Sequence, residues 1–360
     1  MWKLRRNELQ RKAQLEAFDA DNNLSAQHNI FGLPFTEETA ALVLLPVPWE
    51  VTVSYRDGAA AAPRAIRRQS HQIDLFDRRY GTLWQQGIHM RAHPDTWQQA
   101  GNRLRERVRS YQDALEGKQW MSERAAEDLR ADVNAATSEM VAWVAAQTQS
   151  IWEAGKIPAV VGGDHSTPLG AMQFLRERHP GATLLQIDAH ADLREAFEGF
   201  VHSHASVMFH ALQGASGPGF EKLVQVGVRD FCEAEYQRIQ EDDRIICFFD
   251  QDMKTAQFEG ATWSKQCGQI LEACGREVYL SVDIDGLQAW QSLHTGTPVP
   301  GGLTFEQLVY LMHKLVDSGR RIIGFDLCEV GGHAQHEWDA IVGARLLYQM
   351  ALATLQGLEN

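Results

Sequence analysis

The sequence predicts an α/β protein in which helices cover both faces of a mostly parallel sheet. From about residue 155 onward, strand-like apolar runs alternate with helical stretches, which is typical of parallel sheets built from strand–helix–strand units. In addition, three of the apolar runs end in Asp or His. Open parallel sheets place their functional sites at the carboxyl ends of the strands, so these ends are where we look for chemistry.

The first part of the chain supplies one expected strand and two long helices. The apolar run 41–47 is expected to form a strand that prolines interrupt. Pro63 is well placed at the start of a short helix, because proline fits the first helical position. The highly charged stretch 96–116 and the stretch 122–154, whose apolar residues recur at helical spacing, are expected to be helices.

The remainder of the chain carries the alternation itself. Further strands are expected at 157–161, 183–188, 223–228, 244–249, 277–284 and 321–327, with helices near 168–177, 304–317 and 338–356. No internal repeat or linker is visible, so we expect one domain over residues 41–360. Residues 1–40 are interpreted as an N-terminal arm, whose first 35 residues are polar with weak helical character; it either packs on the body or on a neighbouring subunit, or is disordered.

The composition excludes several classes of function. The chain has 360 residues, and Lys+Arg 34 against Asp+Glu 47 gives 34 − 47 = −13. This charge argues against a nucleic-acid partner and mildly favours a cationic ligand, although solubility alone would also explain it. The five cysteines form no C-x-x-C pair, so we expect neither a zinc knuckle nor a disulfide framework. With no apolar run near the ~20 residues of a membrane span, and no signal peptide, we expect a soluble cytoplasmic protein.

The run 184–192 carries the most informative pattern. It is mostly apolar and ends with Asp188, His190 and Asp192 at alternate positions. In an extended chain alternate residues point the same way, so two carboxylates and an imidazole share one rim of a buried strand. Taken alone, either aspartate could be a cap or a turn residue, and the histidine could be solvated or a hydrogen-bonded core residue.

Two further runs end in the same way. His165 follows the expected strand 157–161, and Asp283 and Asp285 end the strand-like run from 278. Two histidines and four aspartates are more ligands than one divalent ion usually needs. The excess of carboxylate with no thiolate suits two ions such as Mn²⁺ or Ni²⁺. Two ions about 3.5–4 Å apart lower the pKa of bound water, which predicts hydrolysis.

These three motifs, at 162–166, 188–192 and 281–285, resemble in order the three signatures of the ureohydrolases, the family of arginase, agmatinase and formimidoylglutamase. The resemblance runs from about Leu42 to the C-terminus and is closest to the agmatinase branch. It implies a three-layer α/β/α fold with two Mn²⁺ ions. By this match His165, Asp188, Asp192 and Asp283 hold one ion and Asp188, His190, Asp283 and Asp285 the other, with Asp188 and Asp283 bridging.

The resemblance also implies roles for residues that are not metal ligands. Asp192 would orient the attacking hydroxide, and His204 looks like the histidine that relays protons, with its neighbour His202 as a rival. Glu329 looks like the carboxylate that pairs with the guanidinium of the substrate, because a planar cation and a carboxylate form a bidentate pair.

The sequence departs from the family pattern at two places. Gln288-Ala289 stands where family members usually have Asp-Pro, and Val330-Gly331 replaces the usual Asn-Pro after the glutamate. All six expected metal ligands are present, so these changes bear on the substrate more than on the fold. Two tryptophans, Trp49 and Trp290, could wall the pocket, although core or interface positions are the more usual ones.

We therefore expect a metal-dependent hydrolase that acts on the C–N bonds of linear amidines and releases urea from a small cationic guanidino compound. Candidate substrates are agmatine, a guanidino acid, free guanidine and a substituted guanidine. We expect a homo-oligomer, a trimer or hexamer. Two alternatives stay open: a formimidoylglutamase, which releases formamide, and a catalytically weak subunit of a mixed oligomer.

Overall fold

An eight-stranded sheet forms the centre of the computed structural model, which describes residues 2–21, 29–213, 219–332 and 335–358. All strand pairings in the sheet are parallel, and the spatial order is β2-β1-β3-β8-β7-β4-β5-β6. The strands are β1 (Leu42–Val47), β2 (Ile88–Met90), β3 (Ile157–Gly162), β4 (Thr183–Ile187), β5 (Lys222–Val226), β6 (Ile245–Phe248), β7 (Glu277–Asp283) and β8 (Arg321–Cys328). The predicted parallel α/β architecture is confirmed.

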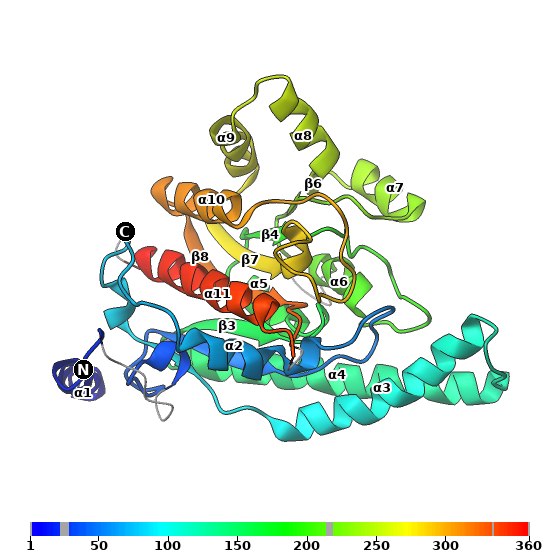
Figure 1. Cartoon of the computed structure of the whole chain (residues 1–360), viewed down its shortest axis with the longest axis horizontal. Helices are drawn as coiled ribbons and strands as arrows, with labels where there is room; N and C mark the ends of the chain where they lie inside the picture. Colours follow the sequence, from blue (N-terminus) through cyan, green and yellow to red (C-terminus); the bar gives the residue numbers. More distant parts are fainter. Residues whose placement is uncertain (1, 22–28, 214–218, 333–334, 359–360) are drawn as a thin grey trace.

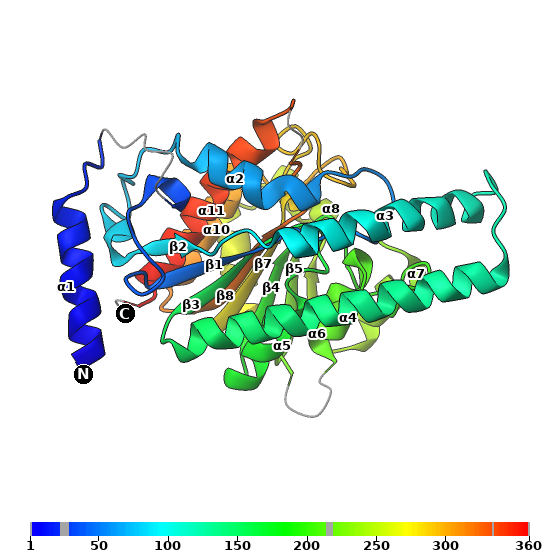
Figure 2. The ribbon, with the colours of Figure 1, turned by 90° about the horizontal axis from the view of Figure 1, so that it is seen from below.

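Helices cover both faces of this sheet (Figure 1). One face is covered by α2 (Ala62–Ser70), α8 (Asp250–Phe258), α9 (Trp263–Ala273), α10 (Phe305–Asp317) and α11 (Trp338–Gln356). The other face is covered by α3 (Asp95–Leu115), α4 (Glu123–Glu153), α5 (Leu169–Arg178), α6 (Val207–Leu212) and α7 (Glu233–Glu241). The helices α3 and α4 run side by side as a long hairpin that extends past the sheet (Figure 2).

The alternation of side chains along each strand creates two hydrophobic cores. In β1, Leu42 and Leu44 join the core beneath α11, whereas Val43 and Leu45 join the core beneath α4. Successive strand residues point to opposite faces, and a sheet covered on both faces is apolar on both. Full burial of each such side chain contributes roughly 1.5–3 kcal/mol, so both layers of helices are held by the same strands.

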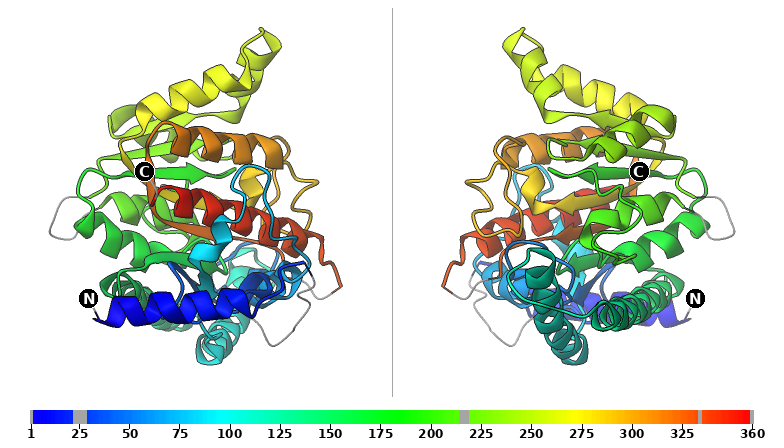
Figure 3. Two further views of the ribbon diagram at one scale, coloured as in Figure 1. Left: turned by 90° about the vertical axis from the view of Figure 1, so that its left-hand side faces the viewer. Right: turned by 90° about the vertical axis from the view of Figure 1, so that its right-hand side faces the viewer.

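The ends of the sheet carry segments that the sequence patterns did not resolve. Helix α1 (Trp2–Glu16) lies at the β2 end and the pair α8–α9 at the β6 end (Figure 3). The segment 30–35, assigned to the expected arm, lies in the hydrophobic core with Ile30 and Phe31 buried.

All seven predicted strands are present within two residues of their expected bounds, whereas β2 was missed. No helix in the described ranges has both the length and the apolar character needed to cross a membrane.

The close contact between α4 and α5 depends on a glycine and yields a stability test. A Cβ atom at Gly170 of α5 would lie 2.1 Å from the Val141 carbonyl oxygen of α4. We expect Gly170→Ala to lower the free energy of unfolding by roughly 1–3 kcal/mol, because the two helices would have to separate. The matched control is Gly268→Ala in α9, where a Cβ meets nothing within 4 Å; it should stabilise by up to about 1 kcal/mol. Urea unfolding measures both, and a Gly170→Ala protein as stable as the control would contradict the expectation.

Candidate metal centre

The six predicted metal ligands follow three strands that lie close together in the sheet. His165 follows β3, and Asp188 to Asp192 follow β4. Asp283 ends β7, and Asp285 lies two residues beyond it. In the sheet order, β7 is next to β4, and only β8 separates β7 from β3. Because all of these strands are parallel, their carboxyl ends meet at one edge.

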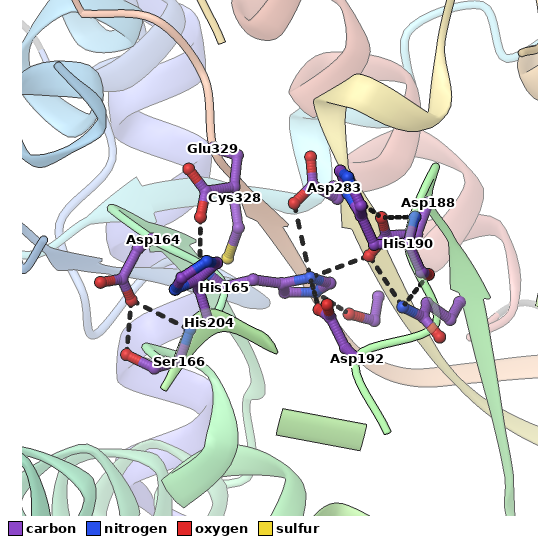
Figure 4. A network of polar contacts seen from close by, with 12 residues as sticks. Asp164, His165, Ser166, Asp188, His190, Asp192, His204, Asp283, Cys328 and Glu329 are labelled. Carbon is purple, nitrogen blue, oxygen red and sulfur yellow. Dashed lines mark hydrogen bonds and ion pairs between the residues drawn. The ribbon is translucent and has the colours of Figure 1, made fainter. Parts of the chain in front are cut away.

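The first group of ligands surrounds the Nδ1 atom of His165 (Figure 4). This nitrogen lies 2.9 Å from Asp192 Oδ2 and 3.0 Å from Asp188 Oδ2. Asp283 Oδ2 is 3.5 Å away from the same nitrogen. His165 Nδ1 is buried and forms no hydrogen bond of acceptable geometry with any described residue. A buried nitrogen that faces three carboxylates in this way matches a coordination site.

The second group shares one carboxylate with the first. His190 Nδ1 lies 3.1 Å from Asp285 Oδ2 and 3.6 Å from Asp188 Oδ1. Asp188 therefore presents one oxygen to each group, which is the geometry of a bridging carboxylate. Asp283 adjoins the first group, and its Oδ1 accepts a hydrogen bond of 2.9 Å from the Asp285 amide. Its predicted bridging role stays a prediction.

A hydrogen-bond chain fixes which nitrogen of His165 faces the carboxylates. Ser281 Oγ donates to Asp326 Oδ1 at 3.0 Å and lies 2.9 Å from His165 Nε2. Since the serine proton is already donated, Nε2 must carry the proton, and the lone pair stays on Nδ1. Asp326 and Cys328 also lie near Nε2 and form a further possible ligand group with His165. The hydrogen bonds through Ser281 explain this arrangement without an ion.

The electrostatics of the cluster favour cations. Within the described part of the chain, no lysine or arginine forms an ion pair with the four aspartates. Burial, and then the charge of Asp188, raise the pKa of Asp192 to about 7. Burial and the neighbouring carboxylates raise the pKa of Asp283 well above its usual range. Carboxylate and imidazole donors without thiolate suit ions such as Mn²⁺ or Ni²⁺, so the residues present fit a pair of divalent ions.

A cavity of about 180 Å³ opens onto these ligands. Its lining combines metal-centre residues with loop residues: Ser54, His165, His190, Asp192, Arg194, Phe197, His204, Ala205, Asp230, Phe231, Glu235, Asp283, Thr297 and Glu329. Both predicted catalytic residues outside the metal cluster, His204 and Glu329, are therefore brought to the site.

Glu329 presents an unsatisfied carboxylate oxygen at this cavity. Its Oε1 accepts a 3.0 Å hydrogen bond from the His165 amide, whereas Oε2 is buried without a hydrogen-bond partner among the described residues. Burial, followed by the charges of Asp164 and Glu50, raises its pKa well above the usual range. The backbone of Glu329 has φ 59, a left-handed conformation that costs energy in a non-glycine residue. A buried acceptor held in this strained position fits a cationic ligand.

His204 is held as a neutral imidazole. Its Nδ1 lies 3.2 Å from Thr52 Oγ1. Burial lowers its pKa to about 3, and the positive charges of His190 and Arg105 act in the same direction. Its rival His202 is absent from the cavity lining and packs edge-on against His210, with ring centroids 4.7 Å apart.

The two tryptophans proposed as walls lie elsewhere. Trp49 is fully buried and packs against Trp97, whereas the side chain of Trp290 is 58% exposed. Neither lines the cavity. Gln288 accepts a 2.7 Å hydrogen bond from the Trp290 indole. The wall residue Asp230 was missed, although it stands four residues after the end of β5. The strand-end rule that located the candidate metal ligands could have found it.

Comparison with known proteins agrees with this arrangement. The arginase family matches residues 40–353. The chain is 30% identical to the N(1)-aminopropylagmatine ureohydrolase of Thermus thermophilus over 89% of this chain and 92% of that protein. Among solved structures, agmatine ureohydrolase of Thermoplasma volcanium has a TM-score of 0.66 and 22% identity, covering 90% of this chain and 93% of that one. Trypanosoma cruzi formiminoglutamase with Mn²⁺ has a TM-score of 0.66 and 14% identity, over 93% and 98%.

The fold and the strand-end cluster define a hydrolase of the ureohydrolase class, which acts on C–N bonds of linear amidines. Within this class the chain belongs to the arginase family, and the resemblance inferred from the three motifs is confirmed.

The shared carboxylate gives the sharpest test of the metal centre. We expect Asp188→Asn to weaken binding of Mn²⁺ more than about 100-fold, because both groups lose a charged ligand. Isothermal titration of the metal-free protein measures this. The matched control is Asp128→Asn on α4, where the side chain is 73% exposed and far from the cluster in the sequence. Unchanged Mn²⁺ affinity and stoichiometry in Asp188→Asn would contradict the assignment.

Proposed function

We propose that the protein hydrolyses a guanidino compound with the help of two divalent ions and releases urea. His165, Asp188, Asp192 and Asp283 would hold one ion, and Asp188, His190, Asp283 and Asp285 the other. The observation that carries the proposal is the cavity in which an unsatisfied buried carboxylate, Glu329, lies beside two Asp/His groups that share Asp188.

Glu329 is suited to bind the planar cation of the substrate. A guanidinium group offers paired N–H donors that match a carboxylate and form strong charge-assisted hydrogen bonds. Gly296 leaves space beside the Glu329 carboxylate, because a Cβ atom at this position would lie 3.3 Å from Glu329 Oε2. Binding the cation would supply the partner that Oε2 lacks in the described chain.

The remaining site residues would guide the water and the proton. When bound, a pair of divalent ions lowers the pKa of water enough to supply a nucleophile at neutral pH. Asp192 would accept a hydrogen bond from the attacking water and so orient it. If Thr52 donates to Nδ1 of His204, the proton of the neutral imidazole lies on Nε2. His204 would then relay a proton, gaining one at Nδ1 as the Nε2 proton passes to the leaving amine.

A substrate panel tests the reaction class. We expect urea from at least one guanidino compound in the presence of Mn²⁺ or Ni²⁺, and loss of turnover when a chelator removes the metal. Guanidino and formimino compounds are assayed in parallel for urea, ammonia and formamide. Formamide without urea would establish amidine hydrolysis instead. A metal-loaded protein that hydrolyses none of them would favour the weak-subunit alternative.

Replacing the cation-binding carboxylate separates substrate binding from metal binding. We expect Glu329→Gln to lower kcat/KM about 10–100-fold, because the amide keeps the shape but loses the charge-assisted pair. Metal content, measured by mass spectrometry, should equal that of the parent protein. Loss of metal from Glu329→Gln would show that Glu329 belongs to the metal centre, and unchanged kcat/KM would exclude its role as the cation partner.

A further inference from the structure

We propose that Arg194 forms a carboxylate-binding subsite in the cavity, so that the substrate carries a carboxylate in addition to its guanidino or amidine group. This inference rests on the proposed function, because it concerns the other end of the same ligand. The subsite would favour a guanidino acid over a guanidine that ends in an amine.

Arg194 is built into the cavity wall beside the proposed chemistry. It lines the cavity two residues after the metal ligand Asp192, and its backbone N–H donates to Ala205 O at 3.2 Å. Its guanidinium carbon lies 5.2 Å from the ring centroid of Phe197. Phe197 in turn packs edge-on against His204, with centroids 5.5 Å apart. This stack of side chains connects Arg194 to the proposed proton relay.

The hydrogen-bonding capacity of Arg194 is largely unused. Its one ion pair in the described chain joins Nε to Glu235 Oε2 at 3.6 Å. Among the described residues, the guanidinium donates no hydrogen bond, and 36% of the side chain is exposed. The planar pair of terminal N–H groups is the geometry that binds a carboxylate bidentately.

Glu235, the acidic wall residue next to Arg194, is already engaged, whereas Asp230 is mostly exposed. Glu235 is buried, and its two oxygens accept hydrogen bonds from the amides of Leu193 at 3.1 Å and Cys232 at 2.9 Å. Asp230 Oδ2 lies 3.9 Å from Nε2 of the metal ligand His190. An ammonium group on the ligand would therefore meet an arginine of like charge and, in Glu235, a buried carboxylate with other partners. Of these two acidic wall residues, only the exposed Asp230 could attract it.

The cavity thus offers two groups of opposite charge that have hydrogen-bonding capacity to spare, Glu329 and Arg194. A volume of about 180 Å³ suits a small ligand. A molecule with a planar cation at one end and a carboxylate at the other would satisfy both charges, whereas a polyamine would satisfy only one. Guanidino acids and formimino acids share this chemistry, and their products, urea and formamide, distinguish them.

The experiment compares three compounds that share a guanidino group and a four-carbon chain: 4-guanidinobutyrate, N-butylguanidine and agmatine. A formimino acid of similar length forms a fourth arm. With the Mn²⁺-loaded protein, we expect kcat/KM for the acid to exceed that for N-butylguanidine by about 10–100-fold, because the acid gains one charge-assisted pair. We expect kcat/KM for agmatine to be the lowest of the three, because its amine carries the same charge as Arg194.

Arg194→Gln should abolish this preference. We expect kcat/KM for the carboxylate compounds to fall about 10–100-fold and that for N-butylguanidine to change less than about threefold. Arg194→Lys should restore only part of the preference, since lysine keeps the charge without the planar fork. The matched control is Arg238→Gln, an arginine outside the cavity that pairs with Glu195 and stacks on Phe209; it should keep the parent preference.

Binding measurements separate this inference from the proposed function. If none of the compounds is hydrolysed, the proposed function fails, and calorimetric binding of the acid and of N-butylguanidine still tests the subsite. Tighter binding of the acid that Arg194→Gln removes supports it. Three results would overturn the inference. These are equal binding of both compounds, a preference of the parent protein for agmatine, and an equal loss of kcat/KM for all compounds in Arg194→Gln.

Discussion

Mutual repulsion among four buried aspartates is the constraint on which the rest of this structure depends. Backbone amides hold three of them in place: Asp188 Oδ1 accepts from His190 N at 2.7 Å, Asp283 Oδ1 from Asp285 N at 2.9 Å and Asp285 Oδ1 from Ala189 N at 3.1 Å. These bonds orient the carboxylates but do not neutralise them. Added positive charge is therefore needed to relieve the repulsion between the carboxylates, and a divalent-metal centre has this property.

The strand order explains how segments far apart in the sequence share this charge. Strand β8 lies between β3 and β7, and its last residue, Cys328, pairs in register with Asp283. The next residue, Glu329, donates its amide to Gly163 O at 2.9 Å. Gly163 is essential there, because a Cβ atom would lie 1.9 Å from Trp49 O. The proposed substrate-binding carboxylate and the proposed metal ligands therefore belong to one edge of the sheet, which favours a preorganised site.

The sequence was sufficient to predict the strands and the cluster of Asp and His residues at their ends. Apolar runs bounded by polar residues locate strands such as 183–188, and spacing along one strand places Asp188, His190 and Asp192 together. Strand β2 was missed because three residues, Ile88–Met90, are too few for a periodic pattern. The hydrogen bonds that link His165, Ser281 and Asp326 could not be predicted either. Ser281 and Asp326 lie in β7 and β8, and His165 follows β3, and no local pattern encodes the order of these strands.

Arg194 and Phe197 of the cavity wall were the hardest residues to predict, because a separate part of the fold positions their loop. The loop that carries Phe197 and His204 follows the end of β4 and is braced by the α3–α4 hairpin. Gln112 of α3 donates to Glu198 Oε2 at 2.8 Å, and Asn134 of α4 donates to Gly199 O at 3.1 Å. Helix side chains fix this loop, while strand ends position the proposed metal ligands and Glu329. The part of the wall that carries Phe197 and His204 is thus positioned separately from the metal cluster.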